Sequence, residues 1–320
     1  MIVVKRFFVV WLLSIGIVSA REPGLTAQQV LVKMNHAMDV LNYQGTVAFL
    51  KNGKLEPMKY VHAAENGVQQ ERLLSLNSPL REIIRDGGKV SCLFKETQQT
   101  IVDHRPFERS FLVDIPINLD EMGAIYQFEI VGEEDVAMLP SYVVAIQSKD
   151  DARYSRKIWV EKQQFLPLRV VVYDNSGVLL EQVVFTDIEV KDALPFVDVK
   201  FLDAAYPAQH IHQLQTQTSD QAAFVVTWLP KGFREIFFAR KPMHNAEQPV
   251  DHLLLSDGFT SVSVYMENKS SAMQPGLQSV GAVNSYSRTI NNYQLTVMGE
   301  VPAETVKFIA EGIKLRDLKN

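Results

Sequence analysis

The sequence predicts a mainly β protein with a few helices, in which a large antiparallel sheet domain precedes a small α+β domain. Residues 158–190 hold two runs rich in Val, Leu, Ile and Phe on either side of the turn residues 174–177, which is typical of a β-hairpin. Short strand-like runs with turn signals between them recur along most of the chain, and this favours an antiparallel meander over a βαβ fold. A Gln- and Thr-rich segment, residues 203–221, separates the two sets of strands.

The N-terminal end predicts a secretory signal peptide over residues 1–20. Lys5 and Arg6 precede an apolar run, and Ser19 and Ala20 offer small residues for cleavage. The alternative is an uncleaved membrane anchor, but the run is shorter than the ~20 residues that span a bilayer. We expect an exported protein without an internal disulfide, because Cys92 is the only cysteine.

A helix is predicted over residues 25–41, where apolar residues recur at three- and four-residue steps. Thr26 and Gln29 have the spacing of a capping box. The apolar stripe includes Met34 and Met38, whose flexible side chains suit either a hydrophobic core or a surface that binds ligands of different shapes. Strands are predicted at 43–50, 57–64, 68–76, 81–85, 89–94, 99–103, 126–131, 141–147 and 153–161. We expect residues 104–124 to form a flap or short helix over this sheet.

The second domain is predicted to be a small sheet closed by one helix. Strands are expected at 224–228, 233–239, 252–255, 259–267, 279–285 and 293–298. Pro302 suits the start of the final helix, over residues 302–315. The resulting domain limits are 21–202 for the large domain, 203–221 for a flexible linker and 222–320 for the small domain.

Both faces of the hairpin at 158–190 carry apolar residues. Strict alternation places one set on one face: Ile158, Val160, Leu168, Val170, Val172, Leu180, Val184 and Ile188. The other face receives Trp159, Val171, Tyr173, Leu179, Val183 and Phe185, with Arg169 and Glu181 among them. Leaving five or six large apolar side chains in water would forgo on the order of 10 kcal/mol. We therefore expect helices of the same chain, a ligand or a partner to cover the second face.

The sequence offers no convincing catalytic or metal-binding pattern. It lacks the nucleophile elbow, the zinc-protease helix, the phosphate-cradling Gly-rich loop and the CxxC pair. His210 and His212 have no accompanying ligands at metal-site spacing, so we expect no metal and no cofactor. The formal net charge of −5 argues against bulk nucleic-acid binding. The residues alone support a binding protein for an apolar ligand or peptide.

Several motifs resemble the periplasmic regulators of the envelope-stress sigma factor, the RseB/MucB family. They are LNYQG at 41–45, REIIRDGG at 81–88, IWVEKQQFLPLRV and VYDNSGVLLEQVVF within 158–190, TWLPKGF at 227–233, LLLSDGFTSVSVYME at 253–267 and the closing GEVPAETVKFIAEGIK. Their order and spacing span nearly the whole chain after residue 20. The turn at 163–167 and the residue before Arg81 depart from the usual family pattern.

The resemblance implies a large N-terminal domain shaped like the periplasmic lipoprotein carriers, an antiparallel half-barrel with helices over its concave face. It implies a partner, the periplasmic region of a membrane-bound anti-sigma factor of the RseA/MucA type, which the protein shields from proteolysis. Lipopolysaccharide or another acyl lipid is expected to release that hold. The sequence leaves a homo-oligomer open.

These expectations lead to two sets of candidate site residues. Acyl chains are expected on the concave face, with candidates Trp159, Val171, Tyr173, Val183, Phe185, Met34 and Met38. The anti-sigma segment is expected to contact Arg81, Trp228, Phe233 and Arg288, since Trp and Arg are frequent binding anchors. Two rival functions are a lipid or lipoprotein carrier without a regulatory role and an enzyme with polar groups deep in its cavity.

Overall fold

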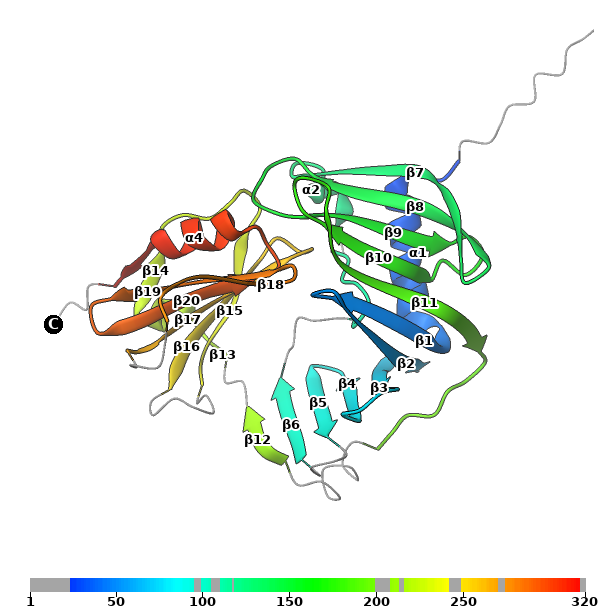
Figure 1. Cartoon of the computed structure of the whole chain (residues 1–320), viewed down its shortest axis with the longest axis horizontal. Helices are drawn as coiled ribbons and strands as arrows, with labels where there is room; N and C mark the ends of the chain where they lie inside the picture. The colour runs from blue at the N-terminus through cyan, green and yellow to red at the C-terminus, as the bar shows by residue number, and fades with distance from the viewer. Residues whose placement is uncertain are drawn as a thin grey trace, which may run out of the picture.

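The computed structural model describes residues 24–94, 99–104, 110–116, 118–198, 208–212, 216–241, 249–269 and 274–316. Most of these residues belong to one large and one smaller β-sheet (Figure 1). The expected signal peptide lies outside the described residues. Within the described ranges, no helix combines the length and the apolar character that crossing a membrane requires.

The large sheet has twelve strands and does not close into a barrel. Its spatial order is β12-β6-β5-β4-β3-β2-β1-β11-β10-β9-β8-β7. The strands are β1 (Asn42–Lys51), β2 (Lys54–Glu65), β3 (Val68–Ser75), β4 (Arg81–Asp86), β5 (Lys89–Phe94), β6 (Gln99–His104), β7 (Tyr126–Val136), β8 (Leu139–Ser148), β9 (Ser155–Glu161), β10 (Pro167–Tyr173), β11 (Leu179–Lys191) and β12 (Ala208–His212). Figure 1 shows the sheet curving from β7 round to β12. The predicted open antiparallel half-barrel is confirmed.

Local turn chemistry explains the hairpins at the start of this sheet. Asn52 and Asn66 have positive φ angles, as do the glycines that follow them. This backbone is that of a two-residue turn whose twist matches the flanking strands, and Asn-Gly adopts it readily. The pairs therefore fix the β1–β2 and β2–β3 registers.

The smaller sheet packs against a C-terminal helix. Its order is β13-β15-β16-β17-β20-β19-β18, and β14 pairs separately with β21. These strands are β13 (Thr216–Gln217), β14 (Phe224–Val226), β15 (Arg234–Lys241), β16 (Val250–Ser256), β17 (Ser261–Asn268), β18 (Gly276–Val280), β19 (Val283–Ile290), β20 (Tyr293–Gly299) and β21 (Ile313–Leu315). Helix α4 (Ala303–Glu311) buries Val306, Ile309 and Ala310 in the same apolar cluster as Leu253 and Leu255.

Several local expectations differ from the structure. The strand predicted at 126–131 continues through residues 132–135, beyond a bulge at Ile130/Gly132. The helix predicted to extend to residue 315 ends at Glu311, and Ile313–Leu315 form β21. The strand expected at 279–285 is divided by a turn at Gly281, whose φ of 61° ends β18. Of the segment expected to be a flexible linker, Ala208–His212 form β12, which pairs in parallel with β6, and Thr216–Gln217 form β13. The domain limits remain a proposal.

Helix α1 (Ala27–Val40) covers part of one face of the large sheet, which we call the inner face. The capping box predicted at Thr26 and Gln29 is present. Cross-strand pairing places Ile158, Val170, Val183 and Phe49 in one row of this face. Helix α1 contacts β2, β7 and β9, and its buried side chains join the apolar cluster of the first sheet. Their burial fixes the helix across the strands (Figure 1).

Candidate functional site

A cleft of about 900 Å³ lies between the inner face and the smaller sheet. The second domain sits beside the open side of the curved large sheet (Figure 1). The lining from the large sheet includes Phe49, Met58, Leu73, Arg81, Ile83, Val170, Val172 and Val183. The lining from the second domain includes Phe237, His252, Leu254, Phe259, Ser263, Tyr265 and Met298. The cleft therefore has two walls that differ in chemistry.

The wall on the large sheet is apolar because consecutive strands place aliphatic and aromatic residues in register. Val183 pairs with Val170 on one side and with Phe49 on the other. Farther along the sheet, Leu73 pairs with Ile83. Helix α1 leaves this part of the inner face open, so apolar surface borders the cleft.

The wall on the second domain mixes aromatic rings with hydroxyl groups. It is the face of β15, β16, β17 and β20 opposite to α4, and its central row pairs Phe237, Leu254, Ser263 and Met298. The His252 ring stacks on Tyr265 at 4.4 Å between centroids, and its Nε2 lies 3.1 Å from Ser263 Oγ. A ligand bound in the cleft would therefore contact apolar groups on one side and hydrogen-bonding groups on the other.

Charged pairs border the apolar wall. Arg81 on β4 contacts Glu56 on β2 with 2.5 Å between the guanidinium nitrogen and the carboxylate oxygen, and both side chains are partly exposed. Lys51 and Glu181 form a second pair at 2.9 Å. Such exposed pairs contribute little to stability. They are available to polar groups of a bound molecule.

The segment around Phe111 is held over the inner face by hydrogen bonds to the buried carboxylate of Glu71. Glu71 on β3 accepts hydrogen bonds from Ser110 Oγ at 2.6 Å and from the Phe111 amide at 2.9 Å. It also accepts from the Tyr60 hydroxyl at 2.6 Å. Burial, together with the nearby charge of Glu71, raises the pKa of Tyr60 well above its usual value, so Tyr60 stays a donor. Phe111 and its neighbour Leu112 line the cleft, which the carboxylate thereby shapes.

Replacing Glu71 by Gln is expected to loosen this segment. The amide presents one acceptor oxygen to three donors, so at least one buried donor loses its partner, at a cost of about 1–3 kcal/mol. Hydrogen exchange at the Phe111 amide should accelerate by about tenfold or more. Glu65→Gln, an exposed substitution on β2, is the control and should leave that rate unchanged. Unchanged protection in Glu71→Gln would contradict this role for the carboxylate.

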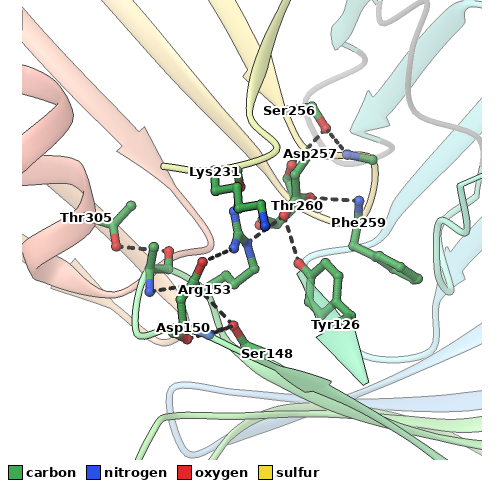
Figure 2. A network of polar contacts seen from close by, with 12 residues as sticks. Tyr126, Ser148, Asp150, Arg153, Lys231, Ser256, Asp257, Phe259, Thr260 and Thr305 are labelled. Carbon is green, nitrogen blue, oxygen red and sulfur yellow. Dashed lines mark hydrogen bonds and ion pairs between the residues drawn. The ribbon is translucent and has the colours of Figure 1, made fainter. Parts of the chain in front are cut away.

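A buried charge network joins the two domains (Figure 2). The side chains of Arg153 and Asp257 are fully buried, and Arg153 Nε lies 2.8 Å from Asp257 Oδ2. Arg153 also donates to the Lys231 carbonyl at 2.6 Å. The Tyr126 hydroxyl donates to Asp257 at 2.8 Å, and burial, followed by the Asp257 charge, raises the pKa of Tyr126 well above its usual value. This network fixes the orientation of the cleft walls.

The expected lipid-cavity residues do not share one cavity. Val183 lines the cleft, whereas Phe185, Met34 and Met38 are buried in the cluster that includes α1. Trp159, Val171 and Tyr173 occupy the opposite, outer face. There the Arg169 guanidinium lies 4.3 Å from the Trp159 ring centre, and Trp159 Nε1 donates to Glu134. Long polar side chains of the chain itself thus shield Trp159, which is 3% exposed.

The face grouping inferred from alternation is wrong for Glu181, Val183, Phe185 and Val184. Val172 pairs with Glu181 but Tyr173 pairs with Leu179, so β11 has one extra residue at this point. A bulge of this kind reverses which face the following residues occupy. It moves Glu181, Val183 and Phe185 to the inner face and turns Val184 outward.

The expected partner contacts are also dispersed. Arg81 lines the cleft. Phe233 is 7% exposed and lies beneath the Arg153 guanidinium at the domain junction. Arg288 donates to the Ala310 and Ile313 carbonyls, which completes the C-terminal end of α4. Trp228 is 45% exposed and meets Phe308 of α4 at 6.0 Å between centroids.

Sequence reasoning missed the second wall of the cleft, including Phe237, His252 and Tyr265. Alternation in β15, β16 and β17 could have indicated that these residues face away from α4. It could not indicate that this face turns toward the large sheet. Within the described ranges, no group of three His, Cys, Asp or Glu residues is placed to hold a metal ion.

Two family models match consecutive parts of the chain. The MucB/RseB N-terminal domain matches residues 26–213, and the MucB/RseB C-terminal domain matches residues 218–314. The chain belongs to the MucB/RseB family. Sigma-E factor regulatory protein RseB of Escherichia coli K12 is 27% identical over 294 residues, which cover 89% of each chain. Sigma factor AlgU regulatory protein MucB of Pseudomonas aeruginosa PAO1 is 28% identical over 282 residues, or 85% of this chain and 86% of that protein.

A solved structure of a complex between MucA and MucB of Pseudomonas aeruginosa has the same fold. It aligns with a TM-score of 0.71 and 24% identity, and it covers 91% of this chain and 99% of that one. Membership of the MucB/RseB family therefore extends to the arrangement of both sheets.

Proposed function

We propose that this protein is a periplasmic negative regulator that binds the periplasmic region of a membrane-bound anti-sigma factor and protects it from proteolysis. The observation that carries the proposal is the open, two-walled cleft in a member of the MucB/RseB family. The relatives' names describe regulators of sigma factors, and one solved relative is a complex with MucA. The protein acts by binding and not as an enzyme.

The chemistry of the walls suits a polypeptide with one apolar face. Its apolar side chains would rest on Phe49, Val170 and Val183. Its backbone or polar side chains would meet the hydroxyl groups of Ser263 and Tyr265 on the other wall. A cleft of about 900 Å³ is within the range that binds a ligand of drug size or a short stretch of chain.

Lipopolysaccharide or another acyl lipid is proposed to release the anti-sigma factor by competing for the apolar wall. A lipid can weaken the complex only if it binds the free protein better than the complex. The apolar wall also favours the second candidate, a lipid or lipoprotein carrier without a regulatory role. Only the regulator needs to bind the anti-sigma fragment.

The test is a protection assay with the purified periplasmic fragment of the cognate anti-sigma factor. The fragment is exposed to the protease that initiates its destruction, with and without an excess of this protein. We expect cleavage to slow in proportion to the fraction of fragment bound. A fragment that does not bind, or that is cleaved equally fast when bound, would exclude the regulator and leave the carrier.

A further inference from the structure

One side chain of the second domain is packed into the core of the first. Phe259 lies in the turn between β16 and β17, yet it belongs to the apolar cluster of the large sheet and not to the cluster under α4. Its ring meets Tyr126 edge to face at 5.0 Å between centroids and lies 6.0 Å from Phe128. Phe259 also borders the cleft. It therefore fills the β7 end of the inner face from the cleft side.

The turn that carries Phe259 is held by the buried charge network (Figure 2). Asp257 Oδ1 accepts from the amides of Phe259 at 3.0 Å and Thr260 at 2.9 Å. Asp257 Oδ2 accepts a hydrogen bond from the Tyr126 hydroxyl and forms an ion pair with Arg153. Arg156 on β9 donates to the Phe259 carbonyl at 2.7 Å. The carboxylate and the backbone that carries the ring are therefore parts of one turn, which is anchored to the large domain through Tyr126, Arg153 and Arg156.

This coupling favours two discrete arrangements of the junction. A displaced turn would separate Asp257 from Arg153, and a buried arginine that keeps only the partly exposed Asp150 as its partner is costly until water reaches it. Partial displacement is thus the least stable arrangement. The junction is expected either to be closed, with Phe259 seated, or to be open, with both charges hydrated.

We infer that Phe259 occupies a binding site for the end of an acyl chain, formed on β7 by Tyr126 and Phe128. An acyl chain that enters this site expels Phe259 and draws Asp257 away from Arg153 and Tyr126. The second domain is then released from the first. The inference rests on the proposed function, because it states where a lipid acts on the cleft. Phe259 of the protein and the acyl chain of the lipid thus compete for the same site.

The test measures the separation of the two domains in the full chain. Cys92 is first replaced by Ala, and spin labels are attached at Met138→Cys and Glu311→Cys, two exposed positions on different domains. Pulsed electron spin resonance records the distance distribution while palmitoyl-lysophosphatidylglycerol is added below its micelle concentration. We expect the lipid to move a narrow distribution to longer and broader distances.

Two variants test whether Phe259 is the competitor. Phe259→Ala removes the side chain that fills the site, so the lipid concentration at the midpoint should fall by about tenfold or more. Phe308→Ala, which truncates a half-exposed phenylalanine of α4, is the matched control and should leave the midpoint unchanged. Tyr126→Phe keeps the ring under Phe259 and removes only its hydroxyl. It should lower the midpoint in the same direction even if Phe259→Ala does not fold.

Lipid that binds without changing the domain separation, or that does not bind at all, would overturn the inference. So would equal midpoints for Phe259→Ala, Tyr126→Phe and the unmodified chain. Binding of the anti-sigma fragment is measured separately. A chain that opens with lipid but does not bind the fragment supports this inference and excludes the regulatory function. A chain that releases the fragment on lipid addition while its domains stay together excludes the inference alone.

Discussion

Replacing Asp257 by Ala is expected to lower the free energy of unfolding by about 3–5 kcal/mol. The substitution leaves Arg153, whose side chain is fully buried, without the carboxylate 2.8 Å from its Nε. It also removes the acceptor for the Tyr126 hydroxyl and for two amides of the turn. Urea unfolding of the purified chain measures the loss.

Two comparisons identify the cause of that loss. Asp150 contacts the same arginine, but its side chain is 37% exposed, so Asp150→Ala should destabilise the chain much less. Combining Asp257→Ala with Arg153→Met should cost less than the sum of the two single substitutions, because the double variant has no unpaired buried charge. A loss below about 1 kcal/mol for Asp257→Ala would show that the buried pair does not hold the junction.

Replacing Phe49 by Glu is expected to weaken binding of the anti-sigma fragment by about thirtyfold or more. Phe49 lies in the middle of the apolar wall, where it pairs across the strands with Val183. A carboxylate there would face the apolar side of a bound segment, and central apolar anchors contribute about 2 kcal/mol or more when removed. Fluorescence anisotropy of the labelled fragment measures the dissociation constant.

Leu55→Glu provides the control for this prediction. Leu55 lies on the adjacent strand of the same hairpin and is 65% exposed, and it does not line the cleft. The Leu55→Glu variant should bind the fragment as tightly as the unmodified chain does. Equal affinities for Phe49→Glu and Leu55→Glu, with both variants folded, would place the fragment elsewhere on the molecule.

The sequence predicted the elements whose signals are local. The capping box at Thr26 and the Asn-Gly turns at 52–53 and 66–67 depend on neighbours a few residues away, and the structure contains each of them. The apolar character of both sheet faces was also evident from alternation. It implied a covering layer, which α1, Phe259 and the second domain supply on the inner face.

The composition of the site could not be predicted in the same way. The bulge that shifts the pairing at Val172/Tyr173 lies among apolar residues, where either register buries comparable side chains. The strand pattern therefore gave no signal for which face Val183 would occupy. The cleft also requires the second domain to turn its polar aromatic face toward the large sheet. That orientation depends on Arg153 and Asp257, which are 104 residues apart in the sequence.

The most direct test of the central claim is to locate the bound segment by photo-crosslinking. A benzoylphenylalanine is placed at Leu254, on the second wall of the cleft, and in a separate chain at Met138, which is 94% exposed at the β7–β8 turn. Each chain is irradiated with the anti-sigma fragment, and the products are analysed by mass spectrometry. The account predicts a crosslink to one defined stretch of the fragment from position 254 and none from position 138. Crosslinks from position 138 without any from position 254, under conditions in which the fragment is bound, would contradict it.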